Sequence, residues 1–301
     1  MIADLTILFL VRANLAASAA ILLVLLLRPV ARRLLGPEVA YGLWALVPVA
    51  ALTSLFPNLN DFRHGQQVGE PTFQFARADL MLAAFLVGAA VLSALLVISE
   101  WRFRRLARAG RVGPAVVGLS WPSMVVPSDY ETRFNEGERA LIRLHERTHI
   151  DRRHPRDNRL IALHQIFGWF NPLIHLAARC ARLDQELACD AAVIEARPKA
   201  RRLYAETLLK GAKVSGPWSA FACALTEGGR HPLEVRVAQL ARPRLTLRQF
   251  MLGAAAVGAL SVMAALSVWS LSPVSYVAGQ AYRDLPFGAA KITTLRLSPD
   301  G

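Results

Sequence analysis

The chain has 301 residues, of which 54% are hydrophobic and 19% charged, and its mean hydropathy is +0.33. A soluble domain has about 45–50% apolar and about 25% charged residues, so these values exclude a wholly soluble protein. They also exclude a disordered one, which would need low hydrophobicity. The formal net charge of +13 is typical of a protein that meets nucleic acid or the anionic face of a membrane. Three cysteines at no regular spacing exclude a secreted domain built on disulfide bonds.

Four apolar stretches are long enough to cross a bilayer, which takes about 20 residues in a helix. They cover residues 5–27, 39–56, 80–98 and 250–271. Arg12, inside the first stretch, is expected either to extend its charge to the nearer interface or to face the other helices. The sequence therefore predicts a mainly α-helical membrane protein with four transmembrane helices.

Basic residues near the ends of these stretches predict the orientation, because cytoplasmic loops carry more Lys and Arg than external loops. Arginines follow the first and third stretches and precede the fourth. This pattern places the N-terminus outside, residues 100–248 in the cytoplasm and a short tail, residues 273–301, outside again. The same rule accounts for the positive charge, so no direct binding of nucleic acid is expected. A cleaved signal peptide is disfavoured, because no Lys or Arg precedes Arg12.

The block between the third and fourth stretches is expected to contain both strands and helices. Residues 112–127 are typical of two short strands. Residues 136–153 are expected to form an amphipathic helix, with Asn135 as its cap and Glu138 as capping-box partner. A later helix is expected over residues 172–196, where an Asn-Pro pair marks the start.

The first of these helices carries the sequence His145-Glu146-Arg147-Thr148-His149. Residues four apart share a helix face, so both imidazoles can bind one zinc ion. Glu146 is then placed to take a proton from water at the metal and to pass it to the leaving amine. On its own, the pattern also fits a surface helix with two solvated histidines.

A catalytic zinc ion needs a third protein ligand. The helix over residues 172–196 carries Glu186 and Asp190 on one face. Glu186 is the candidate ligand, and Asp190 is the candidate hydrogen-bond partner of a ligating histidine. The alternative is that these carboxylates pair with Arg179 or Arg182.

Three motifs occur in the order HERTH, WFNPLIH and DQELACDAAVI. Together with EVAYGLWALVP and SWPSMVVPS, they resemble the BlaR/MecR family of membrane metalloproteases over residues 1–272. The resemblance implies an α+β gluzincin-type zinc protease domain, inserted between the third and fourth membrane helices. Carried over by motif, it implies a zinc site made of the ligands His145, His149 and Glu186, the base Glu146 and the supporting carboxylate Asp190.

The resemblance also implies a function. The best-known members pass a β-lactam signal from an external sensor domain to the protease, and a DNA-binding repressor is then inactivated. This chain is accordingly expected to be a multi-pass protein of the bacterial inner membrane that cleaves a cytoplasmic regulator as an antirepressor. Two alternatives stay open, a quality-control protease of the HtpX type and a non-catalytic signalling or scaffold protein.

The chain departs from the family pattern at two points. His154 stands where the family often has Asp, so Asp151 or Asp157 is a candidate replacement, and His154 is itself a candidate to approach the metal. No Ser-x-x-Lys motif of a penicillin-binding domain is present. The activating signal is therefore expected from a separate sensor protein, from the tail or from the loop at 57–78.

Five further residues receive structural or minor roles. His164 and His175 are expected to pack on apolar helix faces. Cys180 and Cys189 are expected to be small buried apolar residues. Tyr204 is considered as a donor to the oxyanion, although its spacing does not require that role.

Overall fold

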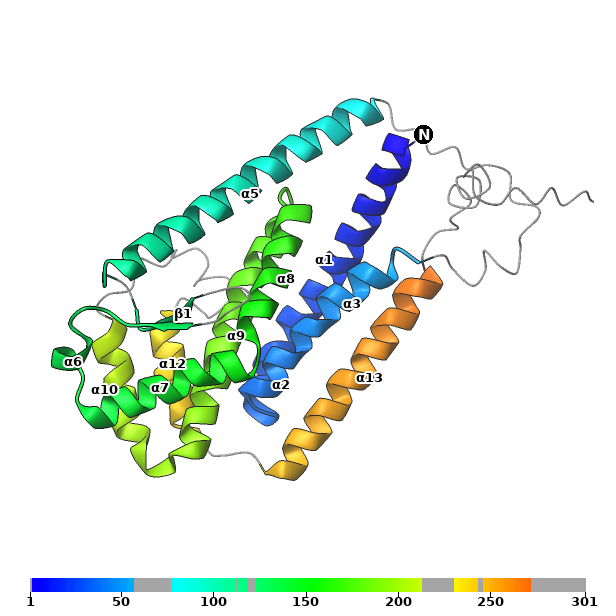
Figure 1. Cartoon of the computed structure of the whole chain (residues 1–301). Coiled ribbons are helices and arrows are strands. Elements are labelled where there is room, and N and C mark those ends of the chain that lie inside the picture. The colour runs from blue at the N-terminus through cyan, green and yellow to red at the C-terminus, as the bar shows by residue number, and fades with distance from the viewer. Residues whose placement is uncertain are drawn as a thin grey trace, which may run out of the picture.

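The computed structural model describes residues 2–56, 77–111, 113–117, 123–212, 230–242 and 246–271. Within this part of the chain, helices dominate and one two-stranded sheet is present (Figure 1). The helices follow in the order α1 (Ile2–Leu34), α2 (Pro37–Gly42), the 3-10 helix η1 (Leu43–Ala45), α3 (Leu46–Thr53), α5 (Ala78–Arg108), α6 (Tyr130–Arg133), α7 (Glu136–Asp151), α8 (His154–Phe167), α9 (Pro172–Ala196), the 3-10 helix η2 (Pro198–Ala200), α10 (Arg201–Ala212), α12 (Pro232–Leu240) and α13 (Leu247–Leu271). The tail 273–301 and nearly all of the loop 57–78 lie outside the described residues.

Among the described residues, three helices are long and apolar enough to cross a membrane, namely α1, α5 and residues Leu247–Ser270 of α13. They coincide with the first, third and fourth predicted spans. The second predicted span, 39–56, corresponds to the shorter apolar segment Pro37–Thr53, made of α2, η1 and α3. This segment is about 25 Å long at 1.5 Å per residue, less than the hydrocarbon thickness of about 30 Å. A crossing by this segment therefore remains a prediction.

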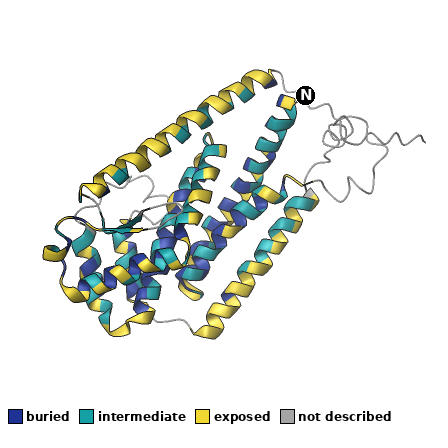
Figure 2. Ribbon diagram, in the orientation of Figure 1, coloured by how far each residue is buried: buried dark blue, intermediate teal, exposed yellow. Residues whose placement is uncertain are grey.

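The membrane helices differ in how much of their surface the protein covers. In α1, 33% of the most apolar window is buried, against 6% in α5 and 6% in α13. Figure 2 shows α5 and α13 exposed along most of their length, although both are apolar. Such large exposed apolar surfaces mark sites of membrane contact. The core instead joins α1 to η1, α3 and α9 through small and branched side chains, among them Ala17, Ile21, Val24, Leu46, Ala177 and Ala181.

A buried carboxylate fixes α9 against α1. Asp184 is 0% exposed and accepts hydrogen bonds from Arg28 Nε at 2.9 Å and Nη2 at 3.2 Å, and from Trp44 Nε1 at 2.8 Å. Arg32 Nε lies 2.9 Å from the Oδ1 atom of the same carboxylate. Because a buried charge is costly to leave unpaired, this network holds α1, η1 and α9 in one arrangement. The sequence gives no local signal for these partners, which lie far apart along the chain.

The predicted strands, the capping box and the start of the later helix are confirmed within residues 112–196. The strands β1 (Ala115–Val117) and β2 (Ser123–Val125) pair antiparallel. At the start of α7, Asn135 accepts a hydrogen bond from the Glu138 backbone N–H at 2.9 Å, and the Glu138 carboxylate accepts one from the Asn135 N–H at 2.8 Å. This reciprocal pair is the predicted capping box. α9 starts at Pro172 and ends at residue 196, as predicted.

Helix α7 ends at Asp151, two residues before its predicted end at 153. Arg153 adopts the left-handed backbone conformation, with φ 58°, which cannot continue a right-handed helix. The chain then enters α8 at His154, with Pro155 in its first turn. This turn places the start of α8 next to the face of α7 that carries the two predicted ligands, as the contacts below show.

Candidate metal centre

Helix α7 holds His145 and His149 on one face, and α9 brings Glu186 to them. The two histidine Nε2 atoms lie 3.1 Å apart. Glu186 Oε2 lies 3.3 Å from His145 Nε2, and its Oε1 lies 3.5 Å from His149 Nε2. The structure thus brings together the three residues that the sequence predicts as metal ligands.

The spacing of these donor atoms fits a zinc ion. Zinc binds nitrogen and oxygen donors at about 2.0–2.2 Å in a tetrahedron, which separates neighbouring donors by roughly 3.3–3.6 Å. The observed separations run from 3.1 to 3.5 Å. Both histidines are buried, whereas 33% of the Glu186 side chain is exposed. A metal held here would therefore be approachable from the Glu186 side, as a catalytic site requires.

Asp190 and Tyr204 lie behind His145. The Nδ1 atom of His145 is 3.3 Å from Asp190 Oδ1 and 2.8 Å from the Tyr204 hydroxyl, which itself donates to Asp190 Oδ1 at 2.7 Å. A histidine that binds metal through Nε2 carries its proton on Nδ1, and these oxygens are placed to accept it. Tyr204 is 1% exposed and bonded on this inner side, so its hydroxyl is not placed as a donor to a substrate oxyanion.

Arg236, from α12, joins the two carboxylates of α9. Its Nε and Nη2 atoms each donate to Asp190 at 2.8 Å, and its Nη1 lies 3.0 Å from Glu186 Oε2. Of the alternative partners considered from the sequence, Arg182 donates instead to Gln165 at 3.3 Å, and Arg179 is exposed. No spacing rule points to Arg236, since it lies on a helix some fifty positions after Glu186.

His154 supports His149 from behind. Its Nδ1 lies 2.9 Å from His149 Nδ1 and 3.5 Å from Cys189 Sγ, and it is 1% exposed. The two aspartates considered as replacements for a carboxylate here lie elsewhere. Asp151 is exposed and paired with Arg147, and Asp157 accepts a hydrogen bond from Tyr41. His154 is thus the residue in contact with the second ligand, and it faces Nδ1, the side away from the three donor atoms.

Glu146 is buried beside the predicted ligands, with 8% of its surface exposed. Burial raises the pKa of its carboxylate, and the backbone of Val116 in β1 has a smaller, opposing effect. A carboxylate acts best as a general base when its pKa lies nearer to neutral pH than that of a free side chain. Position and environment therefore both suit the base role predicted from the sequence.

Burial and neighbouring charges set the protonation of the three donors. Burial opposes a charge on His145, yet hydrogen bonds to the carboxylates of Asp190 and Glu186 raise its pKa to about 10. Burial lowers the pKa of His149 to about 4. Burial also works against ionisation of Glu186, but Arg236 and His145 lower its pKa to about 2. His149 is therefore neutral and Glu186 ionised, as metal binding would require, and His145 would have to release a proton to bind a metal.

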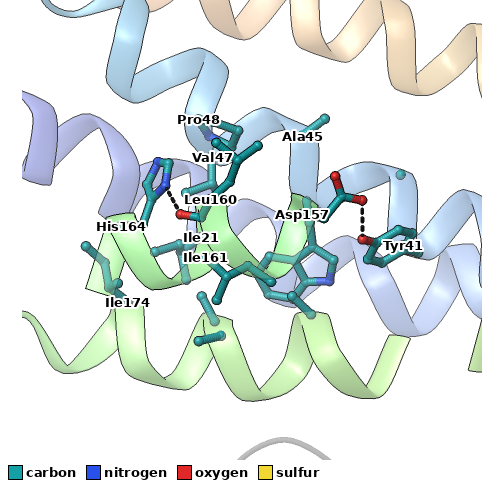
Figure 3. A pocket seen from close by; sticks show the side chains of 15 residues that line it. Ile21, Tyr41, Ala45, Val47, Pro48, Asp157, Leu160, Ile161, His164 and Ile174 are labelled. Atoms are coloured by element: carbon teal, nitrogen blue, oxygen red, sulfur yellow. Dashed lines mark hydrogen bonds between the residues drawn. The ribbon is translucent and has the colours of Figure 1, made fainter. Parts of the chain in front are cut away.

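An apolar cavity of about 250 Å³ lies next to this cluster, between α1, the α2–α3 segment, α8 and α9. Figure 3 shows the Tyr41 hydroxyl donating to Asp157 on one side of the cavity and His164 on another. The Tyr41 ring also packs edge-on against His154, with centroids 5.3 Å apart. The mainly aliphatic lining suits an apolar group and not an ion. The cavity is thus separate from the three predicted ligands, and Tyr41 connects the two regions by lining the cavity and contacting His154.

Comparison with known proteins identifies the family. The family model described as BlaR1 peptidase M56 matches residues 8–83 and 107–240. The chain belongs to this family. The match agrees with the resemblance found in the motifs, and membership suggests a metallopeptidase.

Two relatives of the M56 chain are named for regulation and resistance. The regulatory protein BlaR1 of Bacillus licheniformis is 30% identical over 112 residues, which is 37% of this chain and 18% of that protein. The methicillin resistance mecR1 protein of Staphylococcus aureus is 29% identical over 98 residues, which is 32% of this chain and 17% of that protein. The aligned regions therefore span less than a fifth of either relative.

Proposed function

We propose that the chain is an integral-membrane zinc endopeptidase that cleaves a cytoplasmic regulator, such as a transcriptional repressor, in signal-dependent gene regulation. The observation that carries the proposal is the meeting of His145, His149 and Glu186 at separations that suit zinc, with Glu146 beside them. Membership of the M56 family and the names of the two relatives support proteolysis and regulation. In this proposal the protein lies in the bacterial inner membrane, with its N-terminus outside and its metal centre on the cytoplasmic side.

The chemistry assigns a task to each residue. Bound zinc would supply a Lewis acid that polarises water and the substrate carbonyl. Glu146 accepts the proton that water loses as its oxygen attacks the carbonyl carbon, and it returns that proton to the nitrogen as the C–N bond breaks. Asp190 and Tyr204 keep the His145 ring in one orientation throughout, because they hold its Nδ1 side.

Strand β1 offers a place for the substrate. Within the described residues, β1 pairs only with β2. α7 packs against β1, and the backbone of Val116 interacts with Glu146, so β1 runs beside the proposed base. An extended peptide can add to the edge of a sheet as a further strand. This addition would bring a peptide bond next to Glu146 without a deep pocket for a single side chain.

Three full-length proteins test the proposal, namely the parent, Glu146→Gln and the matched control Glu206→Gln. Glu206 is exposed and pairs with Arg202 away from the site. All three are expected to bind about one zinc ion per chain, because a catalytic site of this type holds one. Peptide cleavage is expected to fall about 10²–10⁴-fold in Glu146→Gln alone, as for loss of a general base. A parent without bound zinc, or a Glu146→Gln variant as active as the parent, would refute the proposal.

The same variant identifies the substrate. Glu146→Gln keeps the proposed metal ligands and is expected to hold substrates without cutting them. Proteins captured with it from bacterial membranes, but not with a Glu186→Gln variant, are the candidates. A DNA-binding repressor among them supports the antirepressor role, whereas misfolded membrane proteins alone would favour the quality-control alternative. If the parent binds zinc but cuts no captured protein, the scaffold alternative holds.

A further inference from the structure

The hairpin formed by α8 and α9 runs beside α1, with its turn at residues 168–171 between α1 and α5 (Figure 1). Near the turn, Asn171 Nδ2 donates to Ser18 Oγ at 2.8 Å. Toward the metal centre, Arg28 donates to Asp184 at 2.9 Å. These two contacts place α1 and α9 side by side and pointing in the same direction.

The positions of these two contacts along α1 and α9 show how far the hairpin extends along the membrane helix α1. From the turn contact to the Asp184 contact, each helix advances ten to thirteen residues, which is about 15–20 Å at 1.5 Å per residue. The hydrocarbon core of a bilayer is about 30 Å thick. α1 is a candidate membrane span, with Ser18 near its middle and Arg28 toward its basic end. The turn therefore lies level with the middle of a span.

The turn also contacts a second candidate span, α5. The rings of Phe170 and Phe85 lie 6.5 Å apart. Trp169 packs so closely on α5 that a Cβ atom at Gly88 would lie 2.2 Å from its Cε2 atom. Only glycine allows this approach, so α5 is shaped to receive the turn. The hairpin thus ends between two membrane helices.

The backbone of the turn has internal hydrogen-bond partners. The carbonyl of Phe167 accepts from Asn14 Nδ2 at 3.4 Å, and the carbonyl of Trp169 lies 2.9 Å from His175 Nε2. The carbonyl of Gly168 accepts from the Asn171 N–H at 2.8 Å. Non-helical backbone at membrane depth is tolerated only when the protein itself satisfies its polar groups. The turn meets this condition at these three carbonyls.

The outer surface of the hairpin changes from charged to apolar with depth. On one face of α8, Arg156 and Arg159 are exposed near the metal centre. Four exposed apolar residues follow, which we call the hairpin stripe. They are Leu160, Leu163, Phe167 and Phe170, with 41%, 47%, 55% and 50% of their surface exposed. A soluble surface gives no reason for such an ordered change, whereas a membrane interface does.

The change from charged to apolar residues on α8 lies at the same depth as the basic end of α1. Asn158 Nδ2 donates to Gln185 Oε1 at 3.3 Å, so the arginines of α8 lie level with the Arg28–Asp184 pair. Arg179 is the exposed charge on α9 between this level and the turn. Its long side chain can extend its guanidinium back toward the interface.

We propose that the α8–α9 hairpin enters the bilayer from the side of the metal centre and turns back inside it, with the hairpin stripe against lipid acyl chains. Part of the 100–248 block then lies within the membrane. Glu186 follows Asp184 by two residues, about 3 Å along the helix, so the metal centre would lie at the membrane surface. The insertion itself does not depend on the metal or on catalysis.

A matched pair of cysteine variants tests the insertion in the full-length chain. Phe167→Cys and Arg156→Cys lie three helical turns apart on the same face of α8, and both positions are exposed in the protein alone. The variants are placed in nanodiscs of phosphatidylcholine and phosphatidylglycerol, which leave both membrane faces open, and treated with a sulfonated maleimide. The parent gives the background from its native cysteines. Arg156→Cys is expected to react at least about tenfold faster, because lipid excludes the charged reagent from Phe167→Cys.

Each other outcome has a defined meaning. Equal rates in nanodiscs would overturn the proposal, as would a disulfide between two copies of Phe167→Cys under oxidation, since a second chain would then cover the stripe. Both variants should react fully in SDS, which shows that the reagent is competent. If Phe167→Cys does not fold, the parent is irradiated with a phosphatidylcholine that carries a diazirine in its acyl chain. Adducts on residues 160–170 support insertion, and adducts on α5 without any on these residues overturn it.

Discussion

Helix α9 contributes one carboxylate to each of two side-chain clusters. The two carboxylates, Asp184 and Glu186, differ in the partners of their oxygen atoms and in their exposure to solvent. Asp184 is 0% exposed, and its oxygens meet Arg28, Arg32 and Trp44 within 2.9 Å. The Glu186 side chain is 33% exposed, and it faces two imidazole nitrogens at 3.3 and 3.5 Å. Asp184 is therefore shielded from solvent, and we call its surroundings the closed cluster. Glu186 is partly exposed to solvent, and we call its surroundings the open cluster.

This difference separates a structural carboxylate, Asp184, from the proposed ligand, Glu186. A carboxylate surrounded by cations and N–H donors has no lone pair left for a metal, so its role is to join helices. A carboxylate beside two imidazoles, each held from behind, has a lone pair directed at a shared point. The two clusters should therefore respond differently to the same change of charge, and the following variants test that expectation.

The largest effect is expected from Asp184→Asn. The amide keeps the shape of the side chain but removes the charge that pairs with two buried arginines, Arg28 and Arg32. Breaking a buried ion pair by removing one partner costs about 3–5 kcal/mol. Unfolding in SDS titrations should shift by this amount, whereas Asp129→Asn, which loses a surface pair with Arg133, should shift by less than about 1 kcal/mol. Equal shifts for both variants would show that the Asp184 cluster is not a structural lock.

Glu186→Gln is expected to weaken zinc binding strongly and to change stability little, in contrast to Asp184→Asn. Zinc affinity is expected to fall by more than about 100-fold, beyond the 10–100-fold typical for loss of an outer partner, because a ligand is removed. Stability without zinc should change little, since the Glu186 side chain is partly exposed and Arg236 keeps its two bonds to Asp190. Competition with a fluorescent chelator measures the affinity, and Glu195→Gln on the exposed face of α9 is the control. Unchanged zinc affinity would remove Glu186 from the proposed ligand set.

Substitution of His154 is expected to weaken zinc binding less than Glu186→Gln does. If His149 binds zinc through Nε2, its Nδ1 carries a proton, and His154 Nδ1 at 2.9 Å is the acceptor. His154→Leu removes the acceptor and should weaken zinc binding about 10-fold or more, whereas His154→Asn keeps an oxygen at the same branch and should weaken it less. Equal affinities in the two variants would contradict the acceptor role.

Cys189→Ala distinguishes a His154 that supports His149 from a His154 that is itself a ligand of a second metal ion. His149, His154 and Cys189 are also close enough to hold an ion of their own. A support role for His154 predicts that Cys189→Ala keeps the zinc content of the parent. Loss of one of two bound ions in this variant would instead show a second metal site.

The parts of the molecule that were predictable share a physical basis in local sequence. The capping box of Asn135 and Glu138, the start of α9 at Pro172 and the shared face of His145 and His149 each depend on residues within one or two turns. Glu186 was reachable because the family motif linked it to the histidines. Local rules and motif spacing were therefore sufficient for the candidate ligands.

The remaining partners were not predictable, because they meet only through tertiary packing. Arg236 reaches Glu186 and Asp190 from a separate helix, and Arg28 reaches Asp184 from the first membrane helix. Neither arginine stands out in the sequence, which contains 35 Lys and Arg residues. Hydropathy marked α1 as a span but could not show that α9 would lie along it, since that register depends on these long-range contacts.

A smaller loss of stability than that of Asp184→Asn is expected from Trp44→Phe, which removes one donor to the Asp184 carboxylate and leaves its charged partners in place. The indole N–H donates to Asp184 Oδ2 at 2.8 Å, and Arg28 Nε donates to the same oxygen at 2.9 Å. Because the carboxylate stays paired, the loss should be that of one hydrogen bond to a charged group plus some packing, about 1.5–3 kcal/mol. Trp101→Phe is the matched control, since Trp101 is 58% exposed and should change stability by less than about 0.5 kcal/mol. An effect of Trp44→Phe as large as that of Asp184→Asn would mean that packing of the indole, and not charge pairing, joins α1 to α9.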